Sequence, residues 1–475
     1  MDTYISPLSS RYASQEMSHL FSPLAKYTLW RTLWVALAES QKELGLDISS
    51  EALAQMRASL SSFDFPRIKE YEKDLRHDVM AHLKAYCDLC PQAAPIIHLG
   101  ATSAYVADNC DLIQMFQALE IIEKKLVQLL RTLSDFSSKY ASMPTLSYTH
   151  FQPAQPTTVG KRAALWLQDF LFDLKDLIFR KDNLYFLGIK GATGTQASIL
   201  TLFNNDKQKV IALDLLVTQK MGFKRALKIS SQTYPRKQDA HVLDLLAHIA
   251  ISSHKFATDM RLLSHLQEIE EPFEEKQVGS SAMPYKRNPV LAERICSLSR
   301  FLIALSENPR YTAATQWLER TLDDAANRRL TLPEAFLTAD AILELVLHIT
   351  ANLTLYPRMM EKHLKEKLGF MTIENILMAG VKKGGCRQEL HEKLRKHSFL
   401  ATERGKQGEE VDPLPLLLSD PEFPLSREEL QTILDDENYT GMASEQVKDY
   451  LSEEVFPMLK KYEKLESLPP RNIEV

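Results

Sequence analysis

Glycine is scarce in this sequence, with 15 residues in a chain of 475. Tight turns between strands use glycine freely, whereas helix interiors avoid it because glycine loses the most conformational freedom on folding. The low glycine content therefore argues against a β-rich protein and favours an all-α one. A chain of this length predicts about two to four domains. Hydrophobic residues, at 45%, are plentiful enough for a sizeable core.

Other absences narrow the class of protein further. The sequence has no run of about 18 apolar residues, so we expect no membrane span. Its first residues, MDTYISPLSSRY, lack the layout of a signal peptide. The five cysteines are an odd number in a long chain, which predicts a reducing cytoplasm. We interpret the Cys87 and Cys90 pair as two reduced thiols on a helix, and a redox or metal-binding pair is the alternative. The net charge of −5 predicts no nucleic-acid partner.

What the sequence does contain is long amphipathic periodicity. From Ala104 to Ala141, apolar residues recur at three- and four-residue steps, which predicts one long helix. Further long helices are predicted over 159–185, 236–266, 290–305 and 333–355, the last with Pro333 in its first turn. On the helix over 159–185, the core candidates are Leu165, Phe170, Leu174, Leu177 and Phe179.

These helices are too long to bury their apolar faces alone, so they must form a bundle. Several carry apolar residues on more than one face, which predicts burial by neighbouring subunits as well. We expect an N-terminal helical domain over 1–102, a central long-helix bundle over 103–355 and a C-terminal helical domain over 356–475. Within the first domain, shorter helices are expected over 22–44, 50–60 and 65–87.

Five short polar segments interrupt the helical pattern, a sixth charge-rich segment is compatible with a helix, and chemistry is expected in all six. They are SSRY (9–12), LRHDV (75–79), HLGATS (98–103), YTHFQPAQPTT (148–158), GSSAMPYKRNP (279–289) and ERTLDDAANRR (319–329). The sequence contains no H-E-x-x-H motif and no Cys/His cluster, so no metal site is predicted.

The segment GSSAMPYKRNP is the most unusual of the six. Gly279 allows mobility, whereas Pro284 and Pro289 restrict it. Lys286 could lower the pKa of a nearby serine hydroxyl so that the serine acts as a base. The amide groups at the start of the following helix favour a carboxylate or phosphate. A plain basic loop between helices is the alternative interpretation.

Two other segments also leave alternatives open. Two prolines hold the backbone after His150 extended, so His150 is either an ordinary surface histidine or a general acid or base. Arg76, His77 and Asp78 are either a solvated helix start or an anion-binding group.

Three of these segments together resemble the fumarase/aspartase superfamily. HLGATS, YTHFQPAQPTT and GSSAMPYKRNP occur in the superfamily's order and at fitting intervals, and the last is similar to its signature, G-S-S-x-M-P-x-K-x-N-P. Within the superfamily, the chain resembles the adenylosuccinate lyase family. This closer likeness rests on Tyr285, Lys286 and Arg287 and on SSRY, RHD (76–78), SSQTYPRKQD (230–239) and ERTLDDAANRR. The resemblance spans essentially the whole chain.

The resemblance implies a three-domain, all-α homotetramer whose long helices form a 20-helix core, with each active site built from three subunits. It implies β-elimination of fumarate from adenylosuccinate, giving AMP, and from the succinyl-carboxamide ribotide SAICAR, giving AICAR, in purine biosynthesis. It implies no metal and no organic cofactor. The alternatives are another fumarate-releasing lyase of the superfamily and a non-catalytic helical scaffold.

The resemblance also implies roles for individual residues. Ser280 matches the general base, and His150 matches the general acid that protonates the leaving nitrogen. The positions that match substrate-binding residues are Arg11, Tyr12, Arg76, His77, Asp78, Thr102, Ser103, Gln232, Lys286, Asn288, Arg294, Arg320 and Arg329. Ala325 departs from the family, which usually has a serine there, so we expect one hydrogen bond to the nucleotide phosphate to be missing.

Overall fold

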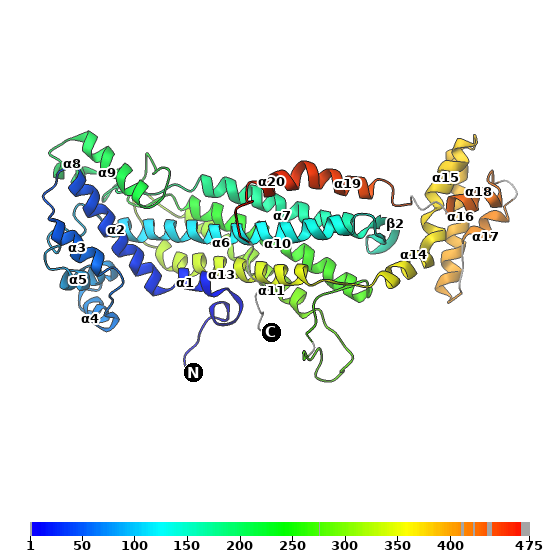
Figure 1. Ribbon diagram of the computed structural model, residues 1–475, viewed down its shortest axis with the longest axis horizontal. Coiled ribbons are helices and arrows are strands. Elements are labelled where there is room, and N and C mark those ends of the chain that lie inside the picture. The colour runs from blue at the N-terminus through cyan, green and yellow to red at the C-terminus, as the bar shows by residue number, and fades with distance from the viewer. Residues whose placement is uncertain (1, 275, 410–412, 421–422, 435–438, 467–475) are drawn as a thin grey trace.

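The structure, a computed structural model, describes residues 2–274, 276–409, 413–420, 423–434 and 439–466. The molecule is elongated, with long helices along its middle and shorter helices at both ends (Figure 1). It is mostly helical, which confirms the all-α prediction. Among the described residues, no helix combines the length and the apolar character needed to cross a bilayer.

The helices of the N-terminal part extend from the middle of the molecule to one end (Figure 1). They are η1 (Leu8–Tyr12), α1 (Gln15–Leu20), α2 (Pro23–Glu43) and, at that end, α3 (Ser50–Ala58), α4 (Phe65–Leu75) and α5 (Asp78–Leu89). The single helix expected over 65–87 is wrong, because Arg76 adopts a left-handed conformation (φ 51°) that ends α4. His77 then caps α5 by accepting a hydrogen bond from the amide of Met80. The break places the start of α5 beside Ser103.

The central bundle consists of α6 (Ser103–Lys139), α7 (Val159–Asp182), α10 (Lys237–His265), α11 (Val290–Leu305) and α13 (Asp324–Ala351). The connecting helices are α8 (Ala197–Leu202), α9 (Lys207–Lys220) and α12 (Glu307–Ala314). Helix α13 starts earlier than expected, so Pro333 lies inside it rather than in its first turn. Asp324 is buried and bound by Arg236, and this contact fixes the helix start ahead of the proline.

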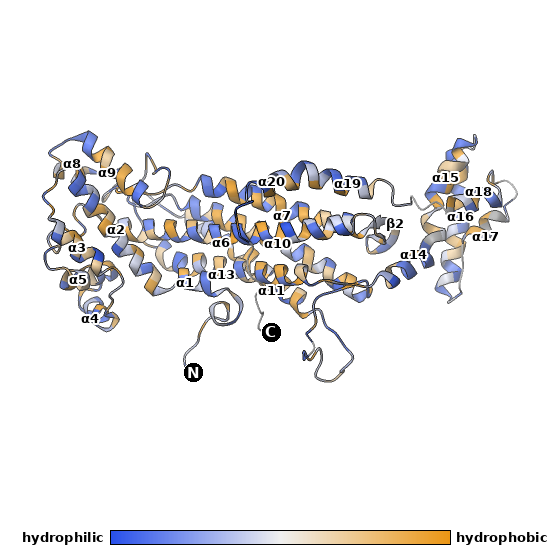
Figure 2. Cartoon of the chain, in the orientation of Figure 1, coloured by the Kyte–Doolittle hydropathy of each residue, from blue (hydrophilic) through white to orange (hydrophobic). Residues whose placement is uncertain are grey.

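One face of α7 is apolar but is not covered by its own chain. Phe170, Leu174 and Leu177 are buried as expected, whereas Leu165 and Phe179 are 47% and 58% exposed, so their assignment to the core of a single chain is wrong. Phe172 is 57% exposed. Leu165, Phe172 and Phe179 recur every seven residues and therefore form one outer stripe along the helix. Figure 2 shows hydrophobic residues along the whole length of the central helices.

A β-hairpin joins α6 to α7 and carries His150 at its tip. Strand β1 (Pro144–Thr149) pairs antiparallel with β2 (Gln152–Thr158), and His150 and Phe151 make the turn between them. Both residues have left-handed backbone angles, with φ of 52° and 56°. Tight hairpin turns require such angles, which residues other than glycine adopt at a cost. A second ribbon pairs β3 (Ile269–Glu270) with β4 (Thr354–Leu355).

The C-terminal part has two portions. Helices α14 (Pro357–Met371), α15 (Ile373–Lys382), α16 (Arg387–Lys406), α17 (Pro413–Leu418) and α18 (Arg427–Leu434) lie at the far end of the molecule, with a separate core that includes Ile376, Leu390 and Leu417. Helices α19 (Ala443–Tyr450), η2 (Leu451–Val455) and α20 (Phe456–Lys460) return along the bundle, where Val447 joins the main core. The three domains and the two boundaries between them stay predictions.

Candidate active site

A cleft of about 1020 Å³ opens between the N-terminal helices and the starts of α6 and α13. It brings together seven residues predicted to bind substrate: Arg76, His77, Asp78, Ser103, Gln232, Arg320 and Arg329. Thr102 is the N-cap residue of α6, next to Ser103. Polar segments from four parts of the chain therefore meet at one place.

The wall of the cleft carries two helix starts. Helix α5 begins at Asp78 and α6 at Ser103, and the Ser103 hydroxyl oxygen lies 3.4 Å from His77 Nε2. Asp78 forms an ion pair with Arg329 at 2.7 Å. The amide groups of helix starts, together with Arg320 on the same cleft, favour an anionic ligand.

Buried ion pairs, which the sequence did not reveal, form the floor of the cleft. Arg236 lies 2.6 Å from Asp324 and 2.8 Å from Asp108, and Arg320 reaches Asp324 at 3.3 Å. Burial alone would lower the pKa of Arg236, but Asp108 raises it above its ordinary value. These charges hold the first turn of α13 and, with it, Arg320. A signal for these ion pairs in the sequence is Asp108, an aspartate within a largely apolar stretch of a predicted helix.

Within the loop between β3 and α11, the segment from Gly279 to Asn288 is held closed by contacts between its two ends. The Asn288 side-chain amide donates a hydrogen bond to the carbonyl of Gly279 at 2.9 Å, and a side chain at Gly279 would collide with the carbonyl of Lys286. The Ser280 hydroxyl accepts a hydrogen bond from the amide of Met283 at 3.1 Å. Lys286 is exposed, and the loop extends away from the bundle (Figure 1). The predicted base and two predicted carboxylate ligands thus share one small loop.

Three further predicted residues gather near the point where this loop joins α11. The Arg294 guanidinium lies 5.4 Å from the centre of the Tyr12 ring, within cation–π distance. Arg11 precedes Tyr12 on η1 and is exposed. They form a second group, separate from the residues that line the cleft.

His150 lies apart from the cleft. The cleft is at the start of α6 and the hairpin follows its end, and this helix has 37 residues, a length of about 55 Å. His150 is exposed at the hairpin tip. A single chain therefore does not bring its predicted general acid to its own cleft.

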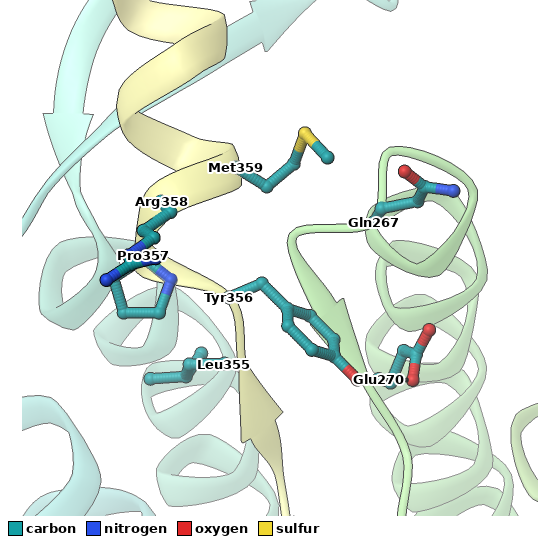
Figure 3. Close-up of a pocket in the computed structure, with 7 residues that line it drawn as sticks. All are labelled: Gln267, Glu270, Leu355, Tyr356, Pro357, Arg358 and Met359. Atoms are coloured by element: carbon teal, nitrogen blue, oxygen red, sulfur yellow. Dashed lines mark hydrogen bonds between the residues drawn. The ribbon is translucent and has the colours of Figure 1, made fainter.

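A second cavity, of about 650 Å³, lies where β3 and β4 meet α14 (Figure 3). Tyr356 points toward Glu270, and its hydroxyl donates a hydrogen bond to that carboxylate at 2.8 Å. Arg287 of the loop lies 3.6 Å from the same carboxylate. This cavity adjoins the base of the loop rather than the cleft. Within the described ranges, no three His, Cys, Asp or Glu side chains are grouped as metal ligands would be.

The architecture matches solved structures of other enzymes. A 3-carboxy-cis,cis-muconate lactonizing enzyme from Pseudomonas putida aligns with a TM-score of 0.82 at 23% identity, over 95% of this chain and 99% of that one. A fumarate lyase from Mesorhizobium sp. BNC1 aligns with a TM-score of 0.81 at 23% identity, over 93% and 99%. Residues 16–301 match the lyase family model. The chain is therefore a lyase with the fumarase/aspartase fold.

Two further findings define the family within this class. Residues 369–450 match the model described as the adenylosuccinate lyase C-terminus. The chain is 46% identical over 467 residues to the adenylosuccinate lyase of Saccharomyces cerevisiae, and the alignment covers 98% of this chain and 97% of that one. It is 47% identical over 464 residues to that of Schistosoma mansoni, over 97% of each chain. The chain belongs to the adenylosuccinate lyase family.

Proposed function

We propose that this chain catalyses, in the cytoplasm, the β-elimination of fumarate from adenylosuccinate, giving AMP, and from SAICAR, giving AICAR, in purine biosynthesis. Relatives that carry the name adenylosuccinate lyase, at 46% and 47% identity, support the first substrate. SAICAR carries the same succinyl group on the carboxamide nitrogen of its base, and that base is attached to a phosphorylated ribose. The arginines of the cleft support an anionic nucleotide as ligand, because guanidinium groups pair with oxyanions through two parallel hydrogen bonds.

The reaction removes a proton from the carbon beside a carboxylate and breaks a carbon–nitrogen bond. Ser280 takes the proton, and His150 donates a proton to the leaving nitrogen. Such groups each contribute roughly 10²–10⁴-fold to the rate. Serine is a weak base, so Lys286 in the same loop stabilises its alkoxide.

Substrate binding divides between two sets of residues. The succinyl carboxylates are held by Thr102, Ser103, Gln232, Lys286 and Asn288. The nucleotide and its phosphate are held by Arg11, Tyr12, Arg76, His77, Asp78, Arg294, Arg320 and Arg329. The two helix starts in the cleft wall support an anion at this place.

Each active site is completed by other copies of the chain in a homotetramer. The observation that carries this proposal is the separation of His150 from the cleft by the length of α6, about 55 Å. The outer stripe of α7 supports an apolar interface between copies. A hairpin tip from one copy and a loop from another complete the cleft of a third.

Two variants of this chain test the proposal. Ser280→Ala and His150→Ala should each lower kcat on adenylosuccinate by roughly 10²–10⁴-fold, as measured by ultraviolet absorbance. When the two inactive variants exchange subunits, part of the activity should return because some sites receive both intact groups.

Three results would contradict parts of the proposal. Full activity of either single variant would remove the role assigned to that residue. No recovery after exchange, with mixed assemblies demonstrated by native mass spectrometry, would exclude sites shared between subunits. Activity on argininosuccinate but not on adenylosuccinate would exclude the substrate.

A further inference from the structure

Glu268 is a carboxylate that the proposed mechanism does not use, and 0% of its side chain is exposed. It directly precedes β3 and meets three other elements. His363 of α14 lies 2.8 Å from Oε1, and the Tyr148 hydroxyl of β1 donates a hydrogen bond to the same oxygen at 3.4 Å. Arg162 of α7 lies 3.7 Å from Oε2. One buried carboxylate thus joins the end of the bundle, the hairpin and the C-terminal helices.

The same group holds β1 from two directions. Arg162 donates a hydrogen bond from Nη2 to the carbonyl of Leu146 at 2.6 Å, while Tyr148 binds Glu268 directly. Burial, and then the charge of Glu268, raise the pKa of Tyr148 above its ordinary value, so its hydroxyl stays protonated and donates. His150 follows two residues later, so this anchor lies next to the tip that carries the proposed acid.

The hairpin tip does not hold its position by itself. His150 and Phe151 both have left-handed backbone angles and both are exposed, and an isolated two-stranded hairpin is marginally stable in water. Packing comes from α14, whose Leu364 forms a small core with Leu146. The alignment of the tip therefore depends on the contacts of Leu146 and Tyr148 on β1, to which Glu268 is linked directly and through Arg162.

We propose that Glu268 is a positioning residue for the general acid: through Tyr148 and Arg162 it fixes the hairpin so that His150 meets the leaving nitrogen in the assembled active site. This inference rests on the proposed function, in which His150 is that acid. Proton transfer requires the imidazole within hydrogen-bond reach of the nitrogen. A small displacement of the hairpin therefore slows this step while the cleft, which lies at the other end of α6, continues to bind substrate.

Three variants test the role of Glu268. Glu268→Gln keeps the shape but removes the charge, and Tyr148→Phe removes one hydroxyl while its ring still contacts Phe151. We expect both to lower kcat by about 10- to 100-fold and to leave KM within about twofold of wild type. Glu123→Gln is the matched control, because Glu123 is also buried and is bound by a lysine and a tyrosine hydroxyl outside the hairpin. Its kcat should equal that of wild type.

A double variant separates positioning from a general loss of structure. In His150→Ala/Glu268→Gln, kcat should equal that of His150→Ala alone, because an absent imidazole cannot be misplaced. If the two substitutions lower kcat in the double variant by the product of their separate factors, the proposal is overturned. Wild-type kcat in both Glu268→Gln and Tyr148→Phe would also overturn it. If thermal melting shows that Glu268→Gln does not fold, Tyr148→Phe decides. Full activity of His150→Ala would instead remove the proposed acid itself, which distinguishes the two failures.

Discussion

At the scale of single residues, two aspartates hold two arginines of the cleft in position. Asp324 restrains Arg320, and Asp78 restrains Arg329, so both guanidinium groups are held in place without substrate. Ala325 lies between these arginines in the sequence and lines the same cleft. Its methyl group offers no hydrogen bond at a position where the family resemblance predicts a serine.

We expect Ala325→Ser to tighten AMP binding because the new hydroxyl donates a hydrogen bond to the phosphate. The gain should be about 0.5–1.5 kcal/mol, or about 2- to 13-fold in Kd, measured by isothermal titration calorimetry. Ala314→Ser, at an exposed alanine of α12 outside the cleft lining, is the control and should leave Kd unchanged. Equal or weaker binding by Ala325→Ser would contradict a phosphate at this position.

A second effect at the residue scale concerns Asp173 of α7. Burial raises its pKa to about 7, although a hydrogen bond from Ser252 opposes the shift, and among the described residues its Oδ2 has no hydrogen-bond partner. The folded state therefore binds this proton more tightly than the unfolded state does. Its contribution to the free energy of unfolding is lost as pH rises from about 4 to about 7 and is constant above that.

Asp173→Asn should remove this pH dependence. The variant should gain stability relative to wild type as pH rises from about 4 to about 7, with an upper bound of about 4 kcal/mol. Urea midpoints of both proteins, measured at intervals from pH 5 to pH 8, test this. A stability difference between the two proteins that does not change with pH would show that Asp173 does not titrate in this range.

At the scale of secondary-structure elements, the connection from α7 to α8 packs against the segment that carries Gln232 of the cleft. In the connection from α7 to α8, Gly194 has φ 82°, and a side chain there would lie 2.0 Å from the carbonyl oxygen of Ser230. The Ser230 segment continues to Gln232, which donates a hydrogen bond to the carbonyl of Ala192 at 3.0 Å. The close approach of the two backbones therefore sets the position of a predicted carboxylate ligand.

Gly194→Ala should destabilise the fold and raise KM, because the Ser230 carbonyl must move. Gly222→Ala is the matched control: its φ is 80°, but a side chain there would meet no atom within 4 Å. The control should cost about 1 kcal/mol from backbone strain alone, and Gly194→Ala should cost more. Chemical denaturation and steady-state kinetics measure both effects. Equal destabilisation with an unchanged KM would contradict the role of this contact.

The whole molecule is organised around helices that one chain does not cover. The outer stripe of α7 leaves Leu165, Phe172 and Phe179 exposed on the central bundle. His150 is exposed at the hairpin tip, and the loop with Ser280 extends away from the bundle (Figure 1). Assembly would therefore bury apolar surface and complete the active sites at the same time.

Phe172→Glu should weaken the assembly and, with it, the activity. A charge on the outer stripe must be desolvated when copies associate, so light scattering should report a smaller mass and kcat per chain should fall. Phe399→Glu is the control, because Phe399 is similarly exposed, at 61%, but lies on α16 away from the bundle. It should leave both mass and activity unchanged. An intact, active assembly in Phe172→Glu would contradict this interface.

Much of the helical pattern could be predicted because it depends on neighbours along the chain. The predicted helix starts at Val159 and Val290 are confirmed. The errors arose where a single backbone conformation or a distant residue interrupts the pattern. Arg76 breaks a helix where the apolar period continues, and buried Asp324, held by Arg236, starts α13 well before Pro333.

The sequence by itself determined the helical class and the chemistry that each polar segment can supply, because both depend on residue type and local order. Only the tertiary structure decided which segments meet. It places Arg76, Ser103 and Arg329 on one cleft and leaves His150 at the other end of α6. Which segments come together depends on the lengths of the helices and on buried partners from remote parts of the chain. A local sequence pattern specifies neither of these.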